Sequence, residues 1–407
     1  MISYSRTVAR NHEDNNYSQY VHQKPEGIQL RMAYPKNNLM RATLSVTVIT
    51  ISFSLLSYTL FMSLLPFTFV QAQNATDIAQ ANKSEPGISI PSTISKEAKE
   101  IIENLTMNMP SIVIPSSDDL KGWQELNQQA SSMFMQMSQP IVDSYQPDVT
   151  ATKLRDVNVL DIKPKDWRDN GKILIYVHGG GYTILGANST LGNVAPVANI
   201  TGLRVISIDY SLAPFSKWNQ TINEVVSVVQ ELKDQGYSLD DIAMYGDSAG
   251  GGLVAGSVLK MRDEGIGIPA ALVLWSPWID LTGIGDTYFT LKNADITIRP
   301  FLSEDSTLQN MADAYANPSD QKNPYVSPLY GNFSNGFPPT LIQGGTKEML
   351  LSDFVRLYQA LDQAAIPVKL DIYEGMPHVF QTFFPNTTES NIAISKTNDF
   401  LKEYLNY

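Results

Sequence analysis

The sequence predicts a fold of the α/β class, with a mostly parallel central sheet flanked by helices. Six apolar runs, each short enough for one strand, alternate with longer segments of helical periodicity. Strands that are buried on both faces of a parallel sheet have such continuous apolar runs, and the helices between them supply right-handed crossovers. The residues with the most unusual chemistry directly follow predicted strands, which is where sites form in such sheets.

Before the sheet, residues 1–41 form a basic arm with six Lys or Arg against three acidic residues. Residues 42–70 contain no charge, and the first 24 of them would cover about 36 Å as a helix, more than the ~30 Å hydrocarbon core. A buried core helix is the alternative, but core helices normally have a polar face. We therefore expect a transmembrane helix or signal anchor at 42–70, with the arm in the cytoplasm and the remainder extracytoplasmic.

Val70 and Ala72 occupy the small-residue positions that signal peptidase prefers, so secretion after cleavage near Ala72 is the alternative. An arm of this length is long for a cleaved signal, which favours the uncleaved anchor. Residues 71–93 are polar and are expected to be a linker. Sequons of the form N-x-S/T follow the uncharged segment and predict a glycoprotein; they begin at Asn74, Asn82, Asn104, Asn188, Asn199, Asn219, Asn332 and Asn386.

Residues 94–407 form the predicted globular domain. Its expected strands are 172–177, 204–209, 241–246, 271–276, 340–345 and 368–373, and its clearest helical patterns are 220–236, 250–265 and 350–364. Two further helical patterns, 95–109 and 117–137, precede the first of these strands. A long interruption separates the fourth strand from the fifth. We expect residues 94–165 and 285–335 to contribute a helical cap or a flank.

The composition excludes several classes of function. The net charge is −12, and the acidic body argues against nucleic acid as a partner, because phosphate binding depends on clustered Lys and Arg. The chain contains no cysteine, which excludes disulfides, thiolate nucleophiles and cysteine-ligated zinc. Of the four histidines, two lie in the N-terminal arm. His178 and His378 are therefore the candidates for a catalytic base.

Ser248 is the candidate nucleophile. It is the central residue of a G-x-S-x-G pattern that runs from Gly246 to Gly250, between a predicted strand and a predicted helix. A sharp turn there would force the serine into a strained backbone conformation, and the two glycines would avoid collisions with the neighbouring strand and helix. The hydroxyl would stand at the positive end of a helix, with the N–H of Ala249 directed at the reacting centre.

His378 is the candidate base because it follows the last predicted strand on a loop. An acid that orients its imidazole is expected after the preceding strand, and both Glu348 and Asp353 are candidates. Glu348 lies in the loop, whereas Asp353 falls in the first turn of the next predicted helix, where the helix dipole explains an acid. We therefore favour Glu348 and keep Asp353 as the alternative.

In order along the chain, "HGGG", "GDSAGG", "SPWIDL", "PPTLIQGG", an E-x-L stretch at Glu348 and "MPHVFQ" resemble the hormone-sensitive-lipase-like carboxylesterases of the α/β-hydrolase fold. The resemblance covers about residues 95–405. It implies a cofactor-free esterase in which the backbone N–H groups of Gly180, Gly181 and Ala249 form the oxyanion hole, and Glu348 is the acid. Supporting positions are expected for His178, Gly179 and Asp247, beside the oxyanion hole and the nucleophile. Two positions, Ser211 and Phe215, depart from the Arg and Glu that many members have.

The motifs thus predict a serine carboxylesterase, and the resemblance implies short- to medium-chain acyl esters as substrates, with acetyl esters and lactones as further options. No metal or other cofactor is expected. The expected partners are a small-molecule ester, the membrane through residues 42–70 if the segment is uncleaved, and a second copy in a homodimer. Two alternatives remain: a non-catalytic binding or receptor protein of the same fold, and an amide hydrolase with the same three catalytic residues. His178 is expected to shape the glycine loop by hydrogen bonding.

Overall fold

The computed structural model describes residues 88–108, 111–303 and 307–407. The expected basic arm (1–41), the membrane or signal segment (42–70), the cleavage position at Ala72 and the linker as far as residue 87 lie outside the described residues. Within the described ranges, the structure contains no helix of sufficient length and apolar character to span a bilayer.

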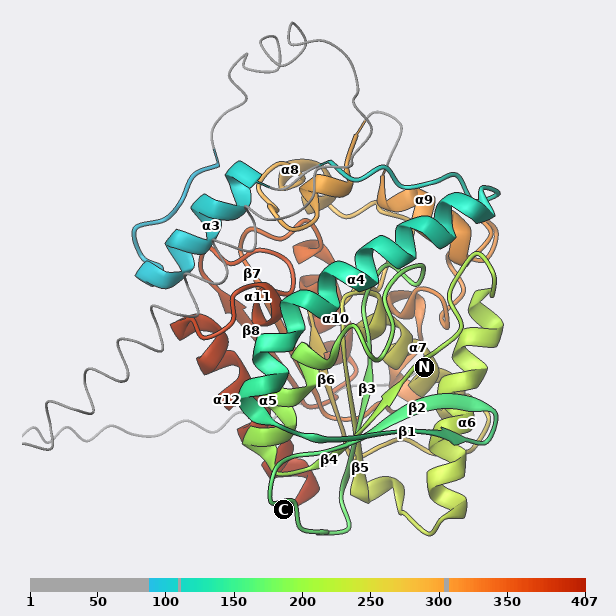
Figure 1. Ribbon diagram of the computed structural model, residues 1–407. Coiled ribbons are helices and arrows are strands. Elements are labelled where there is room, and N and C mark those ends of the chain that lie inside the picture. Colours follow the sequence, from blue (N-terminus) through green and yellow to red (C-terminus); the bar gives the residue numbers. More distant parts are fainter. Residues whose placement is uncertain (1–87, 109–110, 304–306) are drawn as a thin grey trace, which may run out of the picture. The chain divides into compact units, whose positions relative to one another are not determined.

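The centre of the molecule is an eight-stranded sheet (Figure 1). Its strands are β1 (Asp148–Leu154), β2 (Val157–Lys163), β3 (Ile173–Val177), β4 (Arg204–Ile208), β5 (Ile242–Asp247), β6 (Ala271–Trp275), β7 (Thr340–Gly345) and β8 (Val368–Tyr373). They lie in the order β1-β2-β4-β3-β5-β6-β7-β8. The pairs β1·β2 and β2·β4 are antiparallel, and all other pairs of this sheet are parallel. The predicted mostly parallel sheet is therefore confirmed.

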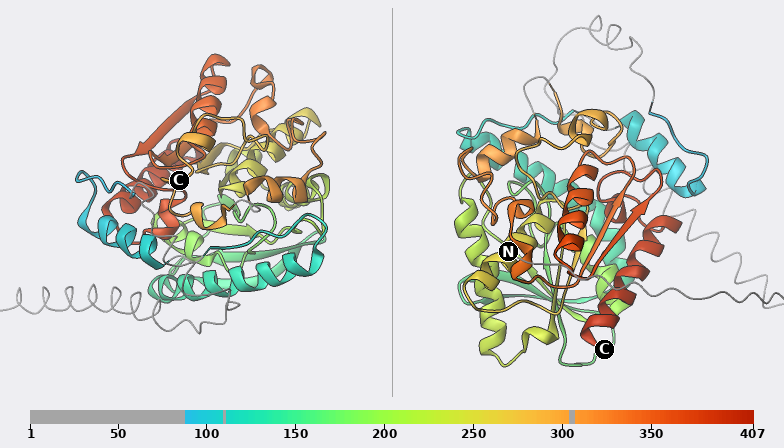
Figure 2. Two further views of the ribbon diagram at one scale, coloured as in Figure 1. Left: turned by 90° about the horizontal axis from the view of Figure 1, so that it is seen from above. Right: turned by 180° about the vertical axis from the view of Figure 1, so that it is seen from behind.

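The helices that accompany the sheet are α3 (Lys96–Asn108), α4 (Leu120–Tyr145), α5 (Leu191–Thr201), α6 (Trp218–Asp234), α7 (Ala249–Asp263), α8 (Thr287–Thr290), α9 (Leu308–Tyr315), α10 (Leu351–Gln363), α11 (Phe380–Phe383) and α12 (Thr388–Leu405). The front and rear views both place α12 beside α5 (Figures 1 and 2). In Figure 1, α8 and α9 lie above the sheet, and α4 runs diagonally in front of it.

Side chains alternate along the central strands between two hydrophobic cores. In β3, Ile173, Ile175 and Val177 belong to the core under α6, α7 and α10, whereas Leu174 and Tyr176 belong to the core under α5 and α12. Strand side chains point to opposite faces in turn, so an uninterrupted apolar run is the signature of a strand covered on both sides. Full burial of each aliphatic side chain contributes about 1.5–3 kcal/mol, so this alternation fixes the register of the strands.

The carboxyl ends of the parallel strands carry the residues singled out by the sequence. His178 follows β3, Ser248 follows β5, Glu348 follows β7 and His378 follows β8. Parallel strands end at the same edge of a sheet, so the four loops meet there. The sheet thereby brings together residues that are up to 200 positions apart in the chain.

All six predicted strands are present, each within one residue of its predicted ends. The helix expected at 117–137 continues through Pro140 to Tyr145. Residues 148–163, within the segment expected to form a cap or flank, instead make the antiparallel hairpin β1·β2 at one edge of the sheet. Most side chains of β1 are exposed. Without a continuous apolar run, the sequence offered no strand signal there.

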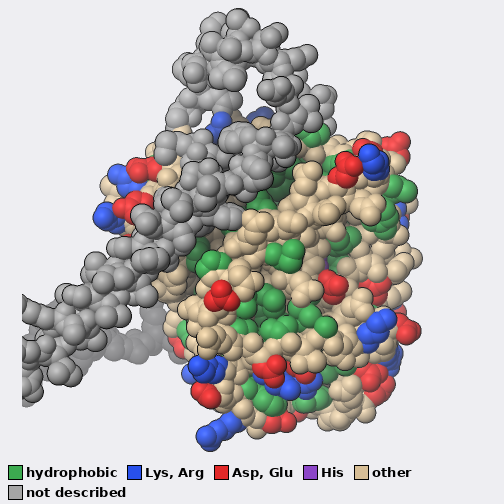
Figure 3. Space-filling model, in the orientation of Figure 1, with side chains coloured by type: hydrophobic (Ala, Val, Ile, Leu, Met, Phe, Trp, Pro, Cys, Tyr) green, Lys and Arg blue, Asp and Glu red, His purple; other side chains and the backbone are tan. Residues whose placement is uncertain are grey.

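The face of the domain shown in Figure 3 carries acidic and basic side chains interspersed with apolar ones. Asp and Glu are scattered among Lys and Arg on this face, where the basic groups do not gather into one large patch. Mixed charge of this kind is typical of an ordinary hydrated protein surface.

Candidate active site

Ser248 occupies a strained turn between β5 and α7. Its backbone has φ 54° and ψ −124°, a combination that ordinary residues rarely adopt and that costs about 1–3 kcal/mol. Glycine is required on both sides of the turn. A Cβ atom at Gly246 would lie 2.6 Å from the carbonyl oxygen of Gly250, and one at Gly250 would overlap the carbonyl oxygens of Val177 and His178. The two glycines therefore allow β5, α7 and the end of β3 to approach closely.

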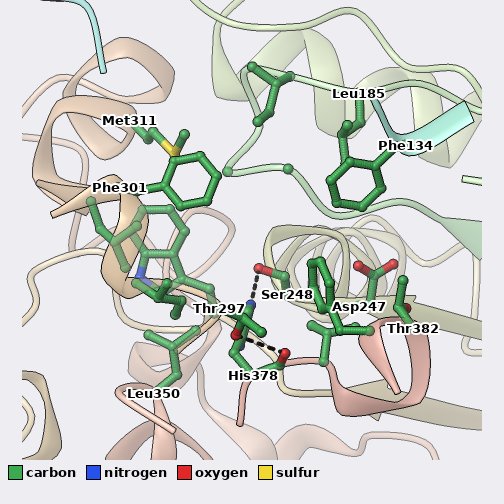
Figure 4. Close-up of a pocket in the computed structure, with 18 of the residues that line it drawn as sticks. Phe134, Leu185, Asp247, Ser248, Thr297, Phe301, Met311, Leu350, His378 and Thr382 are labelled. Atoms are coloured by element: carbon green, nitrogen blue, oxygen red, sulfur yellow. Dashed lines mark hydrogen bonds between the residues drawn. The ribbon is translucent and has the colours of Figure 1, made fainter. Parts of the chain in front are cut away.

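A chain of hydrogen bonds, called the relay below, joins Ser248, His378 and Glu348. The Oγ atom of Ser248 lies 2.9 Å from Nε2 of His378 (Figure 4). Nδ1 of His378 lies 3.1 Å from Oε2 of Glu348. The Glu348 side chain is fully buried, and that of His378 nearly so. The structure therefore brings the three residues proposed from the sequence into direct contact.

The donors around Glu348 determine where the protons of the relay lie. Its Oε1 accepts a hydrogen bond from the N–H of Gly345 at 2.6 Å and from the hydroxyl of Ser276 at 2.8 Å. The Ser276 hydroxyl oxygen in turn accepts from the N–H of Val379 at 2.9 Å, so its own proton is directed to Glu348. Surrounded by donors, Glu348 acts as an acceptor-only carboxylate. Nδ1 of His378 then carries its proton, and Nε2 is free to accept from Ser248.

Electrostatics favours a basic imidazole in the relay. Burial alone would lower the pKa of His378, but the hydrogen bond to Glu348 and the negative charges of Glu348, Asp295 and Asp247 raise it above the ordinary value. Burial raises the pKa of Glu348, whereas the hydrogen bonds from His378 and Ser276 oppose that rise by stabilising the carboxylate. We take the pair as carboxylate and imidazole because of the donor arrangement around Glu348. A stronger base at Nε2 is better suited to remove the proton of Ser248.

The glycine loop after β3 lies against the nucleophile turn. Gly180 and Gly181 have φ values of +102° and +58°, in the region that favours glycine. Asp247, the residue before the serine, accepts hydrogen bonds from the N–H of Gly179 at 3.2 Å and from the hydroxyl of Tyr176 at 2.5 Å. Asp247 thus links the glycine loop to the turn that carries Ser248.

His178 lies behind the loop and is fully buried. Its Nδ1–H donates to the carbonyl oxygen of Gly179 at 2.8 Å, and its ring stacks on Tyr210 with the centroids 4.1 Å apart. Burial lowers its pKa, which keeps the ring neutral. His178 thus contacts the glycine loop, whereas His378 is the histidine in hydrogen-bond contact with Ser248.

Residues 174–382, half of the chain, match the sequence model of a family described by its α/β-hydrolase fold. The chain belongs to the α/β-hydrolase fold family. It is also 32% identical over 235 residues to an acetyl-hydrolase of Streptomyces hygroscopicus, an alignment that covers 58% of this chain and 77% of that protein. The residues matched by the family model include all of β4 to β8, all but the first residue of β3, and the three residues of the relay.

Solved structures support the same assignment for this hydrolase. The crystal structure of esterase E25 has a TM-score of 0.70 and 28% identity, covering 79% of this chain and 98% of that one. An esterase from the bacterial hormone-sensitive lipase family has a TM-score of 0.66 and 28% identity, with coverages of 76% and 99%. These likenesses confirm the resemblance drawn from the sequence motifs. The expected enzyme class, carboxylic ester hydrolase, is confirmed at the level of the family.

An apolar cavity in the hydrolase opens beside Ser248 and His378 (Figure 4). Met311 from α9 and Phe301 lie on one side of Ser248, and Phe134 from α4 lies on the other. Met311 directly covers the glycine loop, because a Cβ atom at Gly181 would overlap its sulfur. The segments 94–165 and 285–335, expected to form a cap or flank, therefore both supply walls of this cavity.

Asp353, the alternative acid, has a different role in the hydrolase. It is buried in the first turn of α10, and its Oδ2 accepts from the N–H groups of Ile279 and Asp280 and from the hydroxyl of Tyr288, each at 3.1 Å. Its hydrogen bonds thus join α10 to the loop after β6 and do not include His378. The helix dipole, offered above to explain this acid, is insufficient, because the side chain turns inward to bind that loop. Burial raises the pKa of Asp353 to about 8.

Replacing Asp353 with asparagine should leave turnover intact and change the pH dependence of stability. The folded-state pKa of about 8 exceeds the unfolded value, so the folded state retains a proton that the unfolded state releases. The contribution of Asp353 to the free energy of unfolding of the parent therefore falls as the pH rises from about 4 to about 8. Relative to the parent, Asp353→Asn should gain about 1 kcal/mol or more between pH 5 and pH 9 in urea unfolding. A variant without ester hydrolysis would instead make Asp353 the acid.

Three polar residues at the site carried no recognisable sequence signal. Ser276 orients Glu348, and Asp295 and Thr297 contact the backbone of His378. All three are buried. Ser276 is part of the quoted "SPWIDL" stretch, but nothing in that stretch shows that its hydroxyl reaches a loop more than 70 residues away. Asp295 and Thr297 lie in the long segment between β6 and β7, where the sequence predicted only a cap or flank.

Proposed function

We propose that this hydrolase is a serine carboxylesterase that cleaves short- to medium-chain acyl esters, acetyl esters among them, through an acyl-enzyme on Ser248. The geometry of the relay supports this reaction. A serine hydroxyl in a strained turn lies 2.9 Å from a histidine whose other nitrogen is bound by a buried carboxylate, at the floor of an apolar cavity. This combination can activate a hydroxyl for attack on a carbonyl carbon.

In the proposed reaction, His378 Nε2 removes the proton of Ser248 as Oγ attacks the acyl carbon. The carbonyl oxygen becomes negative and is stabilised by the N–H groups of Gly180, Gly181 and Ala249. His378 then protonates the leaving alcohol, and the acyl group remains on Ser248. Water, deprotonated by His378, then attacks the acyl carbon. The bond to Ser248 Oγ breaks, His378 returns the proton to Oγ, and the acid is released. Glu348 stays ionised and stabilises the imidazolium in both steps.

The proposed preference for short to medium acyl groups rests on the position of α9. Met311 lies against the glycine loop, so the space beside the oxyanion hole is closed on that side by a side chain from the 285–335 segment. We take this segment and α4 as the cap over the substrate. The name of the acetyl-hydrolase relative supports acetyl esters as one substrate class.

A hydrolysis profile of the full chain tests this proposal. We expect kcat/KM for p-nitrophenyl esters to be highest for acyl groups of about two to eight carbons and to fall by at least about tenfold for palmitate. The reason is that Met311 closes one side of the cavity beside the oxyanion hole, which leaves little room for a long acyl chain. A maximum at palmitate would contradict the acyl preference. Lactones measured in parallel define whether cyclic esters are also opened.

Two controls distinguish the proposed esterase from a non-catalytic binding protein and from an amide hydrolase. A fluorophosphonate probe should label Ser248, as shown by peptide mass spectrometry, and the absence of labelling in folded protein would indicate a non-catalytic binding protein. The p-nitroanilide with the preferred acyl group should be cleaved far more slowly than the matching ester. Equal rates would make the chain an amide hydrolase instead.

A further inference from the structure

Asp295 contacts both of the loops that carry the acid and the histidine of the relay. It lies in the segment between β6 and β7 and is fully buried. Its Oδ2 accepts a hydrogen bond from the N–H of Met349, the residue after Glu348, at 2.9 Å. Its Oδ1 lies 3.3 Å from the N–H of His378. One carboxylate thus binds the backbone beside the acid and the backbone of the histidine itself.

Thr297 completes this contact. Its hydroxyl lies 2.9 Å from Oδ1 of Asp295. The same hydroxyl lies 3.1 Å from the carbonyl oxygen of His378, a contact drawn in Figure 4, so its single proton is shared between two acceptors. The N–H of Thr297 also approaches Oδ1 of Asp295, at 3.3 Å. The peptide groups on both sides of the His378 Cα atom are therefore bound by two residues that lie outside the relay.

The loops that carry Glu348 and His378 follow different strands, β7 and β8, and the distances within the relay depend on their relative position. A shift of about 1 Å in a catalytic group can cost about 10²-fold in rate. We propose that Asp295, supported by Thr297, is a positioning residue of the esterase site. It holds the loops that carry Glu348 and His378 at the positions that keep both residues within hydrogen-bond distance of their partners in the relay. This inference rests on the proposed function, because it assigns a role within that same site.

The charge of Asp295 gives the proposal a readout that a purely structural residue would lack. The ionisable groups that act on His378 are Glu348 from the loop after β7, Asp295 from the segment after β6, and Asp247 from the end of β5. All three are acidic, and each raises the pKa of His378. His378 must be neutral to accept the proton of Ser248, so its pKa sets the acid limb of the pH profile. Removing the charge at position 295 should move that limb to lower pH.

The test compares Asp295→Asn and Asp295→Ala with the parent, using the full chain and p-nitrophenyl butyrate. We expect kcat to fall by at least about tenfold in Asp295→Ala, with KM within about twofold, because the substrate itself does not contact this residue. Asparagine cannot accept with its amide nitrogen, so Asp295→Asn should also lose turnover. Its acid limb of kcat/KM should move down by about half a pH unit or more. Thr297→Val, which keeps the shape of the side chain, provides a second variant should the Asp295 variants fail to fold.

Asp353→Asn is the matched control. Asp353 is equally buried, and it also accepts from two backbone N–H groups and a hydroxyl, but its hydrogen bonds lie outside the relay. The Asp353→Asn variant should change the free energy of unfolding and leave kcat and the acid limb of the kcat/KM profile unchanged. Folded Asp295 variants with parental kcat and an unmoved acid limb would overturn the proposal, as would a folded Thr297→Val with parental kcat if neither Asp295 variant folds. A parent that hydrolyses no ester would instead overturn the proposed function.

Discussion

Replacing Ser248 with alanine should lower kcat/KM for p-nitrophenyl butyrate by about 10⁴-fold or more. The substitution removes the hydroxyl that lies 2.9 Å from His378 Nε2 and leaves no other nucleophile in the proposed mechanism. The oxyanion donors and the cavity remain, so some acceleration over water should persist. Steady-state kinetics before and after treatment with the fluorophosphonate probe would measure the residual rate and exclude contamination, because the probe inactivates parental enzyme but has no serine to label at position 248 of the variant.

Ser257→Ala is the matched control for this substitution. Ser257 lies on the same helix, α7, is fully buried, and has a hydroxyl without a hydrogen-bond partner among the described residues. The same chemical change there should leave kcat/KM near the parental value. Parental activity in Ser248→Ala would remove Ser248 from the mechanism, whereas equal losses in both variants would point to damage to α7 as a whole.

Gly180→Ala should produce the second largest loss, at least about 10²- to 10³-fold in kcat, the usual effect of losing one oxyanion donor. The Cβ atom would overlap the carbonyl oxygen of Ile184, and the φ of +102° is strained for any residue with a side chain. The loop must then move, and its N–H groups move away from the substrate oxygen. The KM for the ester should change much less than kcat, because the donors act mainly in the transition state.

The control for Gly180→Ala separates backbone strain from catalysis. Gly202, after α5, has φ +69° and no atom within 4 Å of the position that a Cβ would take. Gly202→Ala should cost about 1–2 kcal/mol in the free energy of unfolding and leave kcat unchanged. If Gly180→Ala lowered stability by the same amount without lowering kcat, the proposed oxyanion role of the loop would be wrong.

The residues of the relay could be predicted because few positions in the sequence fit each role. The turn that carries Ser248 requires glycine at 246 and 250, since a side chain at either position would meet backbone atoms. Only two histidines lie outside the N-terminal arm, and the place of His378 on the loop after the last predicted strand decided between them. Glu348 was favoured over Asp353 by its place in the loop, and its direct contact with His378 Nδ1 agrees with that choice.

The surroundings of the relay could not be predicted, because their interactions are non-local and involve main-chain atoms. Asp295 binds the N–H groups of Met349 and His378, and any residue except proline offers such a group. No pattern of side chains could therefore reveal the contact.

Helix α12 was missed because its buried face is partly polar. Ser390, Thr397 and Asn398 lie on that face and interrupt the apolar stripe that marks a helix.

The contact between Asp295 and the two loops has a consequence for protein engineering. Exchanging the whole segment between β6 and β7 with that of a relative is an obvious way to transfer substrate preference, because Met311 and the neighbouring walls of the cavity come from it. The same segment, however, supplies a carboxylate that binds the framework of the relay. Under the proposed roles, a chimera needs a donor segment with an acid at this position, because the residues that line the cavity and the carboxylate that binds the backbone of His378 belong to one segment.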